Sequence, residues 1–324
     1  MDAHPDCRPG RDYRRVPSGE RWGYGVTGFN TDGLKPWAGL PAPKPGSAPD
    51  ARIFGVPLDR GSFYRKGAAQ APATLRELSA IFAPVTERAE LFNEVTIEDS
   101  GDLPIVDGDM GANVEAISAT IAKTPAGTVP IVLGGDHTTV APTLVAQQQR
   151  LNGRVAVLYI DAHPDLNDIS RSSRWSNGCA LRRGLELGEV DPRRVLLLGC
   201  RDYDWEEVEY IRQAGVTLIP SAEAHRLTPE QFRDRVQDVA RDGRLHISLD
   251  IDALDPSAAP GTGIPAAGGL TSRELLDFLH ALRGLPLAGL DVDEVAPPLD
   301  QGHVTSLAAL RFIFEFLGAL KLAR

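Results

Sequence analysis

Short apolar runs alternate with amphipathic stretches along the chain from Arg52 onward. The apolar runs are nearly continuous, which is typical of strands buried on both faces, and the amphipathic stretches repeat with the helical period. Strands and helices that alternate in this way indicate a parallel sheet covered by helices on both faces. We therefore predict an α/β fold, a three-layer α-β-α arrangement with a mostly parallel sheet. The apolar runs lie at residues 52–58, 129–135, 154–160, 194–200, 216–220, 245–252 and 286–295.

The chain divides into two regions. Residues 1–48 are rich in proline, glycine and arginine and show neither the strand period nor the helix period, so we predict an extended N-terminal arm. No linker, composition shift or repeat of fixed period interrupts the alternation after residue 50. We therefore expect a single catalytic domain at residues 49–324.

The composition narrows the class of protein. With 324 residues, 42% hydrophobic and 24% charged, the sequence is that of an ordinary globular protein. No apolar run approaches the roughly 18 residues of a membrane span, and the N-terminus lacks the apolar segment of a secretory signal, so we expect no membrane association and a cytoplasmic location. The net charge of -10 argues against nucleic acid as a partner. The three scattered cysteines, Cys7, Cys179 and Cys200, predict reduced thiols rather than a disulfide framework.

Metal-competent side chains follow the apolar run 154–160 directly. Asp161, His163 and Asp165 occupy alternate positions there, so an extended chain places all three on one face. Ligands of open α/β sheets bind at the carboxyl ends of the strands. The sequence therefore predicts that this segment belongs to a functional site.

Two further apolar runs end in residues of the same kinds. The run 245–252 ends with Asp250 and Asp252 at alternate positions, and the run 129–135 is followed by Asp136 and His137 after two glycines that permit a tight turn. Singly, His137 would be typical of a turn or helix cap, and Asp-x-Asp of a solvated turn. Convergence of the three segments on one edge of the predicted sheet favours a shared site. Because carboxylates gathered in a semi-buried cleft repel one another unless cations neutralise them, we predict a metal site.

The kinds of ligand indicate the metal. Five or six ligands dominated by carboxylate oxygen, with two imidazoles and no thiolate, exceed what one tetrahedral zinc requires. They suit two ions in octahedral-like sites, and the oxygen-rich set favours two Mn²⁺ per chain, with Ni²⁺ or Co²⁺ as alternatives. Residues 2–6 also read Asp-Ala-His-Pro-Asp, but no apolar strand precedes them, so we assign that copy to the arm.

The sequence resembles the ureohydrolase family, which includes arginase, agmatinase and other guanidino-acid hydrolases. The resemblance covers about residues 52–320 and is carried by GVPLDRGSFYRKGAAQAPATLRE, GGDHT, DAHPD, SLDIDALDP, APGTGIPAAGGLT and LDVDEVAPPLD. The PGTG-x-P and GGLT segments are most similar to the agmatinase branch. The resemblance implies an arginase/deacetylase-like fold, a homo-oligomer (trimer or hexamer), and a hydrolase that releases urea and an amine from a small guanidino-type substrate.

The resemblance also implies roles for individual residues. Glu294 matches the acid that pairs with the substrate guanidinium, and Thr262 and Arg201 match substrate-side positions. The acids near Arg201, at residues 202–207, are expected at the substrate entrance or, alternatively, at a solvated helix start. One Mn²⁺ would be bound by His137, Asp161, Asp165 and Asp250, and the other by Asp161, His163, Asp250 and Asp252.

The implied mechanism has one step in doubt. Two neighbouring metal ions lower the pKa of a shared water, and Asp165 would carry its proton to the leaving amine. Family members usually place a histidine before a glycine in the following loop, where this chain has Asn177, which cannot shuttle a proton near neutral pH. Either the leaving group needs less proton assistance, or another residue supplies it. In the same loop, Arg171, Arg174 and Trp175 are candidates to meet an anionic or planar substrate tail, or are surface residues.

Three functions therefore remain open. The first is a dinuclear amidinohydrolase that acts on an agmatine-like substrate. The second is a formimidoylglutamase-like or other guanidino-acid C–N hydrolase, for which loss of the histidine is tolerable. The third, favoured only by Asn177, is a metal-binding partner subunit without catalytic activity.

Overall fold

The computed structural model describes residues 33–322. Eight strands form one sheet in the order β2-β1-β3-β8-β7-β4-β5-β6, and every strand pair is parallel. The predicted α/β fold with a mostly parallel sheet is therefore confirmed. The strands are β1 (Ala51–Gly55), β2 (Ile97–Asp102), β3 (Val129–Leu133), β4 (Val155–Ile160), β5 (Val195–Leu198), β6 (Thr217–Ile219), β7 (Arg244–Asp250) and β8 (Leu287–Asp293).

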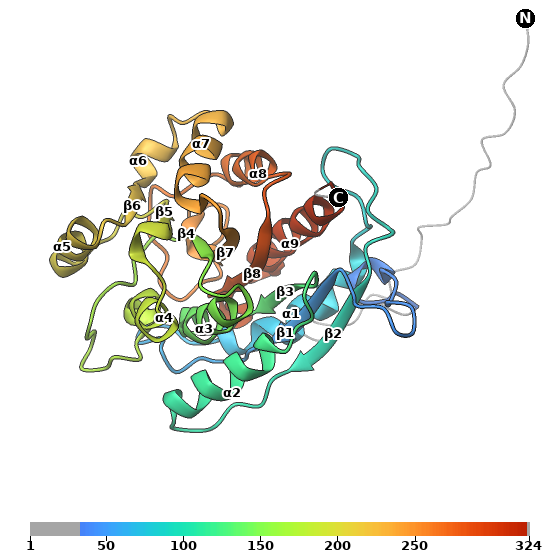
Figure 1. Cartoon of the computed structure of the whole chain (residues 1–324), viewed down its shortest axis with the longest axis horizontal. Coiled ribbons are helices and arrows are strands. Elements are labelled where there is room, and N and C mark those ends of the chain that lie inside the picture. The colour runs from blue at the N-terminus through green and yellow to red at the C-terminus, as the bar shows by residue number, and fades with distance from the viewer. Residues whose placement is uncertain (1–32, 323–324) are drawn as a thin grey trace, which may run out of the picture.

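Helices cover both faces of this sheet, as Figure 1 shows, with α2, α3 and α4 on one side of the strands and α7, α8 and α9 on the other. Alternate strand residues point to opposite faces: Leu158 belongs to the core cluster that includes residues of α1, α7, α8 and α9, whereas Val157 and Tyr159 belong to the cluster that includes residues of α3, α4 and α5. The helices are α1 (Ala71–Leu78), α2 (Met110–Ala122), α3 (Val140–Arg150), α4 (Ala180–Gly188), α5 (Trp205–Ala214), α6 (Ser221–Ala224), α7 (Pro229–Ala240), α8 (Ser272–Ala281) and α9 (Val304–Leu322).

Four elements were not predicted from the hydrophobic pattern: β2, α2, α4 and the four-residue helix α6. The edge strand β2 has the sequence IEDSGD, and only its first residue is buried, so no apolar run marks it. Glycine lowers the helix propensity of α2, at Gly111, and of α4, at Gly184 and Gly188. Tertiary packing determines these elements more than local sequence does.

The described part of the predicted arm, residues 33–48, lies against the domain. Trp37 is buried in the core, its backbone N–H donates to Oγ of Ser79 (2.7 Å), and its indole N–H donates to Oδ2 of Asp99 (2.8 Å). A buried tryptophan with its N–H bonded is a strong hydrophobic anchor. The second Asp-Ala-His-Pro-Asp copy and Cys7 lie outside the described residues; Cys179 and Cys200 are free thiols, as expected.

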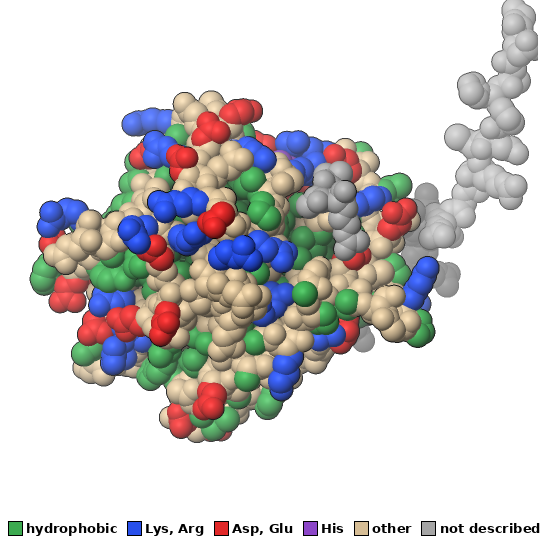
Figure 2. Space-filling view, viewed as in Figure 1, with side chains coloured by type: hydrophobic (Ala, Val, Ile, Leu, Met, Phe, Trp, Pro, Cys, Tyr) green, Lys and Arg blue, Asp and Glu red, His purple; other side chains and the backbone are tan. Residues whose placement is uncertain are grey.

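The helix α9 is long and largely apolar. The stretch Gln301–Lys321 is long and apolar enough to cross a membrane by length and composition alone, although no such run was recognised in the sequence. However, 78% of its apolar window is buried inside the domain, which is the pattern of a core helix. On the face drawn in Figure 2, acidic and basic side chains are interspersed over the surface.

Candidate active site

Four neighbouring strands bring the predicted site residues to one edge of the sheet. In the order β3-β8-β7-β4, the loop after β3 carries His137, β8 is followed by Glu294, β7 ends in Asp250, and β4 leads into Asp161. Because the strands are parallel and adjacent, their carboxyl ends open onto the same region. Segments that are more than 150 residues apart in the chain, such as those of His137 and Glu294 (157 residues), therefore meet.

A tight turn places His137 in this region. Gly135 approaches Leu58 so closely that a Cβ atom would lie 1.8 Å from the carbonyl oxygen of Leu58, so only glycine fits. The next residue, Asp136, is fully buried and accepts a hydrogen bond from the backbone N–H of Gly61 (2.6 Å). The turn is therefore fixed on both sides before the short helix His137–Thr139 begins.

The imidazole of His137 faces three carboxylates. Its Nδ1 atom lies 2.9 Å from Oδ2 of Asp161, 3.2 Å from Oδ2 of Asp250 and 3.4 Å from Oδ2 of Asp165. All four side chains are buried. One ring nitrogen carries at most one proton and cannot satisfy three carboxylates. The arrangement is that of ligands around a common cation.

A second group shares Asp161 with the first. The Nδ1 atom of His163 lies 3.3 Å from Oδ2 of Asp252 and 3.5 Å from Oδ1 of Asp161, so Asp161 presents one oxygen to each histidine. Within each triad, His137–Asp161–Asp165 and Asp161–His163–Asp252, the candidate ligand atoms lie within 4.8 Å of one another. The structure thus brings together all six predicted metal ligands.

The protonation of this cluster shows the cost of leaving it without cations. Burial, together with the charge of Asp161, raises the pKa of Asp165 well above its ordinary range, and burial with the charges of Asp252 and Asp161 does the same for Asp250. Burial alone would lower the pKa of His137, but hydrogen bonds to Asp161 and Asp250 raise it well above its ordinary value. Without cations, the buried carboxylates therefore bind protons more readily than ordinary aspartates do. The donor set of carboxylates and imidazoles without a thiolate fits two divalent ions.

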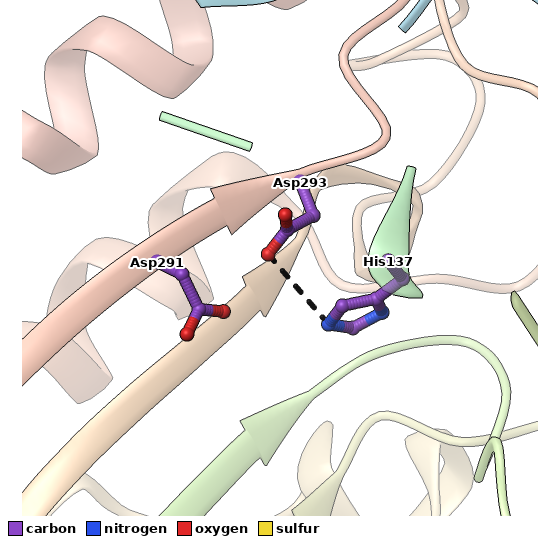
Figure 3. A group of neighbouring side chains, drawn as sticks. All are labelled: His137, Asp291 and Asp293. Atoms are coloured by element: carbon purple, nitrogen blue, oxygen red, sulfur yellow. Dashed lines mark ion pairs between the residues drawn. The ribbon is translucent and has the colours of Figure 1, made fainter. Parts of the chain in front are cut away.

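Two further aspartates lie behind His137, on the side away from the three carboxylates. Figure 3 shows Asp291 and Asp293 on β8 and the Nε2 edge of the imidazole turned toward Asp293, at 3.8 Å from its Oδ2 atom. Gly134 makes room for this side chain, because a Cβ atom there would lie 1.6 Å from Oδ1 of Asp293. These aspartates were not predicted as site residues, although they alternate along β8 as the metal ligands do along β7.

A hydrogen-bonded chain runs from His137 into the sheet. Its Nε2 atom lies 3.0 Å from Oγ of Ser248, which donates to Oδ2 of Asp291 (2.5 Å), and Oδ1 of Asp291 lies 2.5 Å from Nε2 of His246. All four side chains are fully buried. Such partners fix the ring orientation and tautomer of a metal-binding histidine, so that Nδ1 faces the ion. The alternation of His246 and Ser248 with Asp250 was the signal in the sequence.

The carboxyl of Glu294 lies beside the backbone of His137. Its Oε1 atom accepts hydrogen bonds from the backbone N–H of His137 (2.9 Å) and from Nδ2 of Asn177 (3.3 Å). Burial, and then the charge of Asp136, raises the pKa of Glu294 to about 8. Glu294 (φ 59°) and Asp165 (φ 54°) both adopt left-handed backbone, a costly conformation that is concentrated at functional sites.

A cavity of about 190 Å³ opens beside these groups. This volume is below the roughly 300 Å³ of sites for drug-sized molecules, so the cavity fits a small substrate. Its charged and polar lining includes six predicted site residues: His163, Asp165, Asn177, Asp250, Asp252 and Glu294. A planar cation bound to Glu294 here would lie beside the metal ligands.

Thr262 lies next to Glu294 but does not line this cavity. It is fully buried and pairs with Val295 in an isolated antiparallel bridge, and its carbonyl accepts a hydrogen bond from Nη2 of Arg65 (2.8 Å). The structure therefore does not support direct substrate contact, and it places Thr262 in the support of the Glu294 loop.

Arg201, the other predicted substrate-side residue, lies away from the cavity lining. Its guanidinium does not line the cavity but donates to backbone carbonyls in three segments of the chain. The acceptors are the carbonyl oxygens of Asp252 (2.7 Å), Ala266 (2.7 Å), Gly199 (3.1 Å), Ala253 (3.2 Å) and Leu254 (3.3 Å). Arg201 thus holds the loop of a candidate metal ligand, and the sequence could not reveal this because the acceptors are main-chain atoms.

The acids that follow Arg201 were expected either at the substrate entrance or at a helix start, and the structure shows both placements. Asp204 and Glu207 form a capping box at the start of α5, which is the helix-start alternative, yet both also line the cavity. Burial raises the pKa of Glu207 to about 7. Asp202 also lines the cavity, and its side chain is 70% exposed.

The comparisons with known proteins agree with this geometry. A sequence model described as the Arginase family matches residues 49–318. A guanidinopropionase of Pseudomonas aeruginosa is 33% identical over 294 residues, which is 88% of this chain and 91% of that protein. The mitochondrial agmatinase of Gallus gallus is 32% identical over 286 residues, which is 87% of this chain and 84% of that protein. Among solved structures, proclavaminate amidino hydrolase from Streptomyces clavuligerus superposes with a TM-score of 0.82 at 29% identity, covering 90% of this chain and 98% of that one.

Proposed function

We infer that this chain, which belongs to the arginase family of hydrolases acting on guanidino C–N bonds, uses two divalent metal ions to release urea and an amine from a small guanidino substrate. The single observation that supports this proposal best is the meeting of six buried ligand side chains beside the cavity that Glu294 lines. The oxygen-rich ligand set favours Mn²⁺, with Ni²⁺ or Co²⁺ as alternatives.

The metal ions would be held in two groups that share ligands. His137, Asp161, Asp165 and Asp250 would hold one ion, and Asp161, His163, Asp250 and Asp252 the other, with Asp161 and Asp250 shared. When bound, two such ions lower the pKa of a water between them and stabilise negative charge on the reacting centre. Bound cations would also favour the ionised carboxylates of Asp165 and Asp250, whose pKa values burial and neighbouring charges raise.

Glu294 would bind the guanidinium end of the substrate. A carboxylate and a guanidinium match as a planar, charge-assisted pair. The two groups that donate to Oε1, the His137 backbone and the Asn177 amide, hold the carboxyl in place. The central carbon of the guanidinium would then face the metal ligands, because Asp250 and Asp252 line the same cavity.

Asp165 is the candidate proton carrier. Its Oδ2 atom accepts a hydrogen bond from the hydroxyl of Tyr159 (2.7 Å), and the residue lines the cavity. The carboxyl would take a proton from the attacking water and deliver it to the departing nitrogen. Asn177 holds no proton that it could transfer near neutral pH, so the task falls to Asp165.

The relatives differ in the tail of their substrates. A guanidinopropionase acts on a compound with a carboxylate tail, and an agmatinase on one with an amine tail. We propose a substrate of this size, with the guanidinium at Glu294 and the tail toward the cavity mouth.

Urea release is the direct test of the proposal. The protein, loaded with Mn²⁺ or Ni²⁺, is assayed with agmatine, arginine, guanidinobutyrate, guanidinopropionate and formimidoylglutamate. Urea from at least one guanidino compound is expected. Silence on every compound with both metal sites loaded would favour the alternative of a metal-binding partner subunit without activity.

Metal content tests the ligand assignment separately. The wild-type chain should bind two ions, and Asp252→Ala should retain about one, because only one group uses Asp252. Asp202→Ala, which changes an exposed acid at the same cavity, is the matched control and should keep both ions. Two tightly bound ions in Asp252→Ala would contradict the assignment.

A further inference from the structure

We propose that Arg171 binds a carboxylate on the tail of the substrate, so that the chain acts on guanidino carboxylic acids in preference to guanidino amines. The inference rests on the proposed function for the guanidinium end of the substrate. The tail end is determined by the charges at the mouth of the cavity.

Arg171 lies at the same cavity as Glu294. Both residues line it, together with Asp250 and Asp252 of the candidate metal site. A substrate whose guanidinium is paired with Glu294 would therefore have its other end within the same small volume as the Arg171 side chain. A lining arginine is well suited to a carboxylate, because its planar guanidinium offers two parallel donors.

An aromatic ring orients the guanidinium of Arg171, but no acid of the described residues pairs with it. Its Cζ atom lies 4.8 Å from the ring centroid of Phe63, which also lines the cavity, and this cation–π contact orients the side chain. No ion pair joins Arg171 to any residue between 33 and 322. Its donors are therefore available to a ligand.

The other arginines of the loop and the following helix differ from Arg171. Arg174 pairs with Asp168 (3.3 Å) and Glu186 (3.4 Å), and Arg183 pairs with the same two acids (2.8 and 3.2 Å). Neither residue lines the cavity. The loop thus neutralises its other cations within the protein and leaves one facing the cavity.

The acids at the mouth offer less to a cationic tail. Oε1 of Glu207 accepts from the backbone N–H of Leu166 (2.9 Å) and its Oε2 accepts from that of Asp204 (2.9 Å). Oδ2 of Asp204 accepts from the amide of Asn167 (3.1 Å). The carboxylate of Asp202 accepts no hydrogen bond within the described region, but its Oδ2 atom lies 3.9 Å from Nε2 of His163, and its exposure to water weakens any ion pair it forms.

Three compounds that differ only in the tail separate these alternatives. Guanidinobutyrate carries a carboxylate, agmatine an ammonium, and butylguanidine an uncharged methyl. We expect wild-type kcat/KM to be highest for guanidinobutyrate. Arg171→Ala should lower kcat/KM for guanidinobutyrate by about 10- to 100-fold, mainly through KM, as for loss of a charged hydrogen-bonded pair. The value for butylguanidine should stay unchanged.

Two further variants sharpen the test. Arg174→Ala, in the same loop but paired with acids, is the matched control and should leave all three compounds unaffected. Arg171→Glu should favour agmatine over guanidinobutyrate, since the sign of the charge is reversed. A fall in activity that is equal for the three compounds, no fall at all, or a wild-type preference for agmatine would overturn the role of Arg171 while urea release still supports the proposed function.

Failure of the proposed function gives a different result. If no compound yields urea, the same three are titrated calorimetrically into the metal-loaded wild-type and Arg171→Ala proteins. Tighter binding of guanidinobutyrate that is lost in Arg171→Ala would support the tail site without hydrolysis. Binding that is absent or insensitive to Arg171 would end the inference.

Discussion

The Nε2 atom of His137 lies 3.8 Å from Oδ2 of Asp293, a fully buried carboxyl to which no group in the described chain donates a hydrogen bond (Figure 3). Its neighbour on the same face of β8, Asp291, is equally buried but bonded to His246 and Ser248. The oxygens of Asp291 therefore have two partner groups, whereas those of Asp293 accept from none. Unsatisfied buried acids are costly, and they are concentrated at functional sites.

This difference predicts opposite effects for the same chemical change. Asp293→Asn should stabilise the metal-free protein by about 1–3 kcal/mol at neutral pH, because it removes the cost of a buried acid without a donor. Asp291→Asn should destabilise it by a similar amount, because it disrupts bonds to His246 and Ser248. Urea denaturation of both variants checks the prediction. Equal destabilisation would mean that Asp293 has a stabilising partner, such as the imidazole of His137.

The stability difference for Asp293 should also depend on pH. Burial, and then the charge of Asp291, raises the pKa of Asp293 well above 3.8 in the folded protein. As the pH rises through the ordinary aspartate range, the unfolded chain loses its proton first, and wild-type stability falls. Since asparagine does not titrate, the advantage of Asp293→Asn should grow above about pH 4. An advantage independent of pH would contradict this cause.

The pKa of Glu294 predicts the acid limb of the activity profile. Burial raises this pKa to about 8 in the metal-free protein, and only the ionised carboxylate pairs with a guanidinium. We expect kcat/KM to fall about tenfold per pH unit below the operative pKa and to level off above it. Because bound cations favour the carboxylate, the midpoint in the loaded enzyme should lie below 8.

Substitution of Glu294 provides the control for that profile. Glu294→Gln should lower kcat/KM by about 10- to 100-fold on the alkaline plateau and remove this limb of the profile. A limb that survives in Glu294→Gln with the same midpoint belongs to another group, such as a metal-bound water or Asp165.

The amide of Asn177 should act through Glu294. Its Nδ2 atom donates to Oε1 of Glu294 at 3.3 Å, so Asn177→Ala should lower kcat/KM by about 3- to 10-fold. In a Glu294→Gln background the same change should have little further effect, because the two residues act as a unit. Additive losses in the double variant would show that Asn177 has an independent role.

Arg201 should affect stability and leave substrate affinity unchanged. Arg201→Lys replaces a planar group that donates to five carbonyls with a single ammonium, so some acceptors lose their partner. We expect a loss of about 2–4 kcal/mol in stability and an unchanged KM when the assay is run well below the melting temperature. A raised KM at unchanged stability would restore the substrate contact that the structure argues against.

The fold class and the position of the candidate metal site at one edge of the sheet could be predicted from the sequence. A parallel sheet brings the carboxyl ends of its strands to one edge. The acids and histidines that follow three apolar runs are therefore expected to lie close to one another. The hydrophobic pattern that predicts the strands therefore also predicts that the six candidate ligands, Asp161 and Asp250 among them, lie together at this edge of the sheet. The resemblance to the ureohydrolases added Glu294, which has no such pattern of its own.

The hydrogen-bond and charge partners of the individual side chains could be identified from the three-dimensional structure alone. The partners of Arg201 are backbone carbonyls. The hydrogen bond between Asn177 and Glu294 joins residues 117 positions apart in the sequence, and His246 on β7 contacts Asp291 on the neighbouring strand β8. Arg171 and Arg174 belong to the same loop and are alike in the sequence. In the structure, however, Arg174 is paired with two acids, whereas Arg171 lines the cavity. The physical reason is that local periodicity fixes the face on which a residue lies, whereas hydrogen bonds and charge pairs depend on distances of a few ångströms that the packing of distant segments sets.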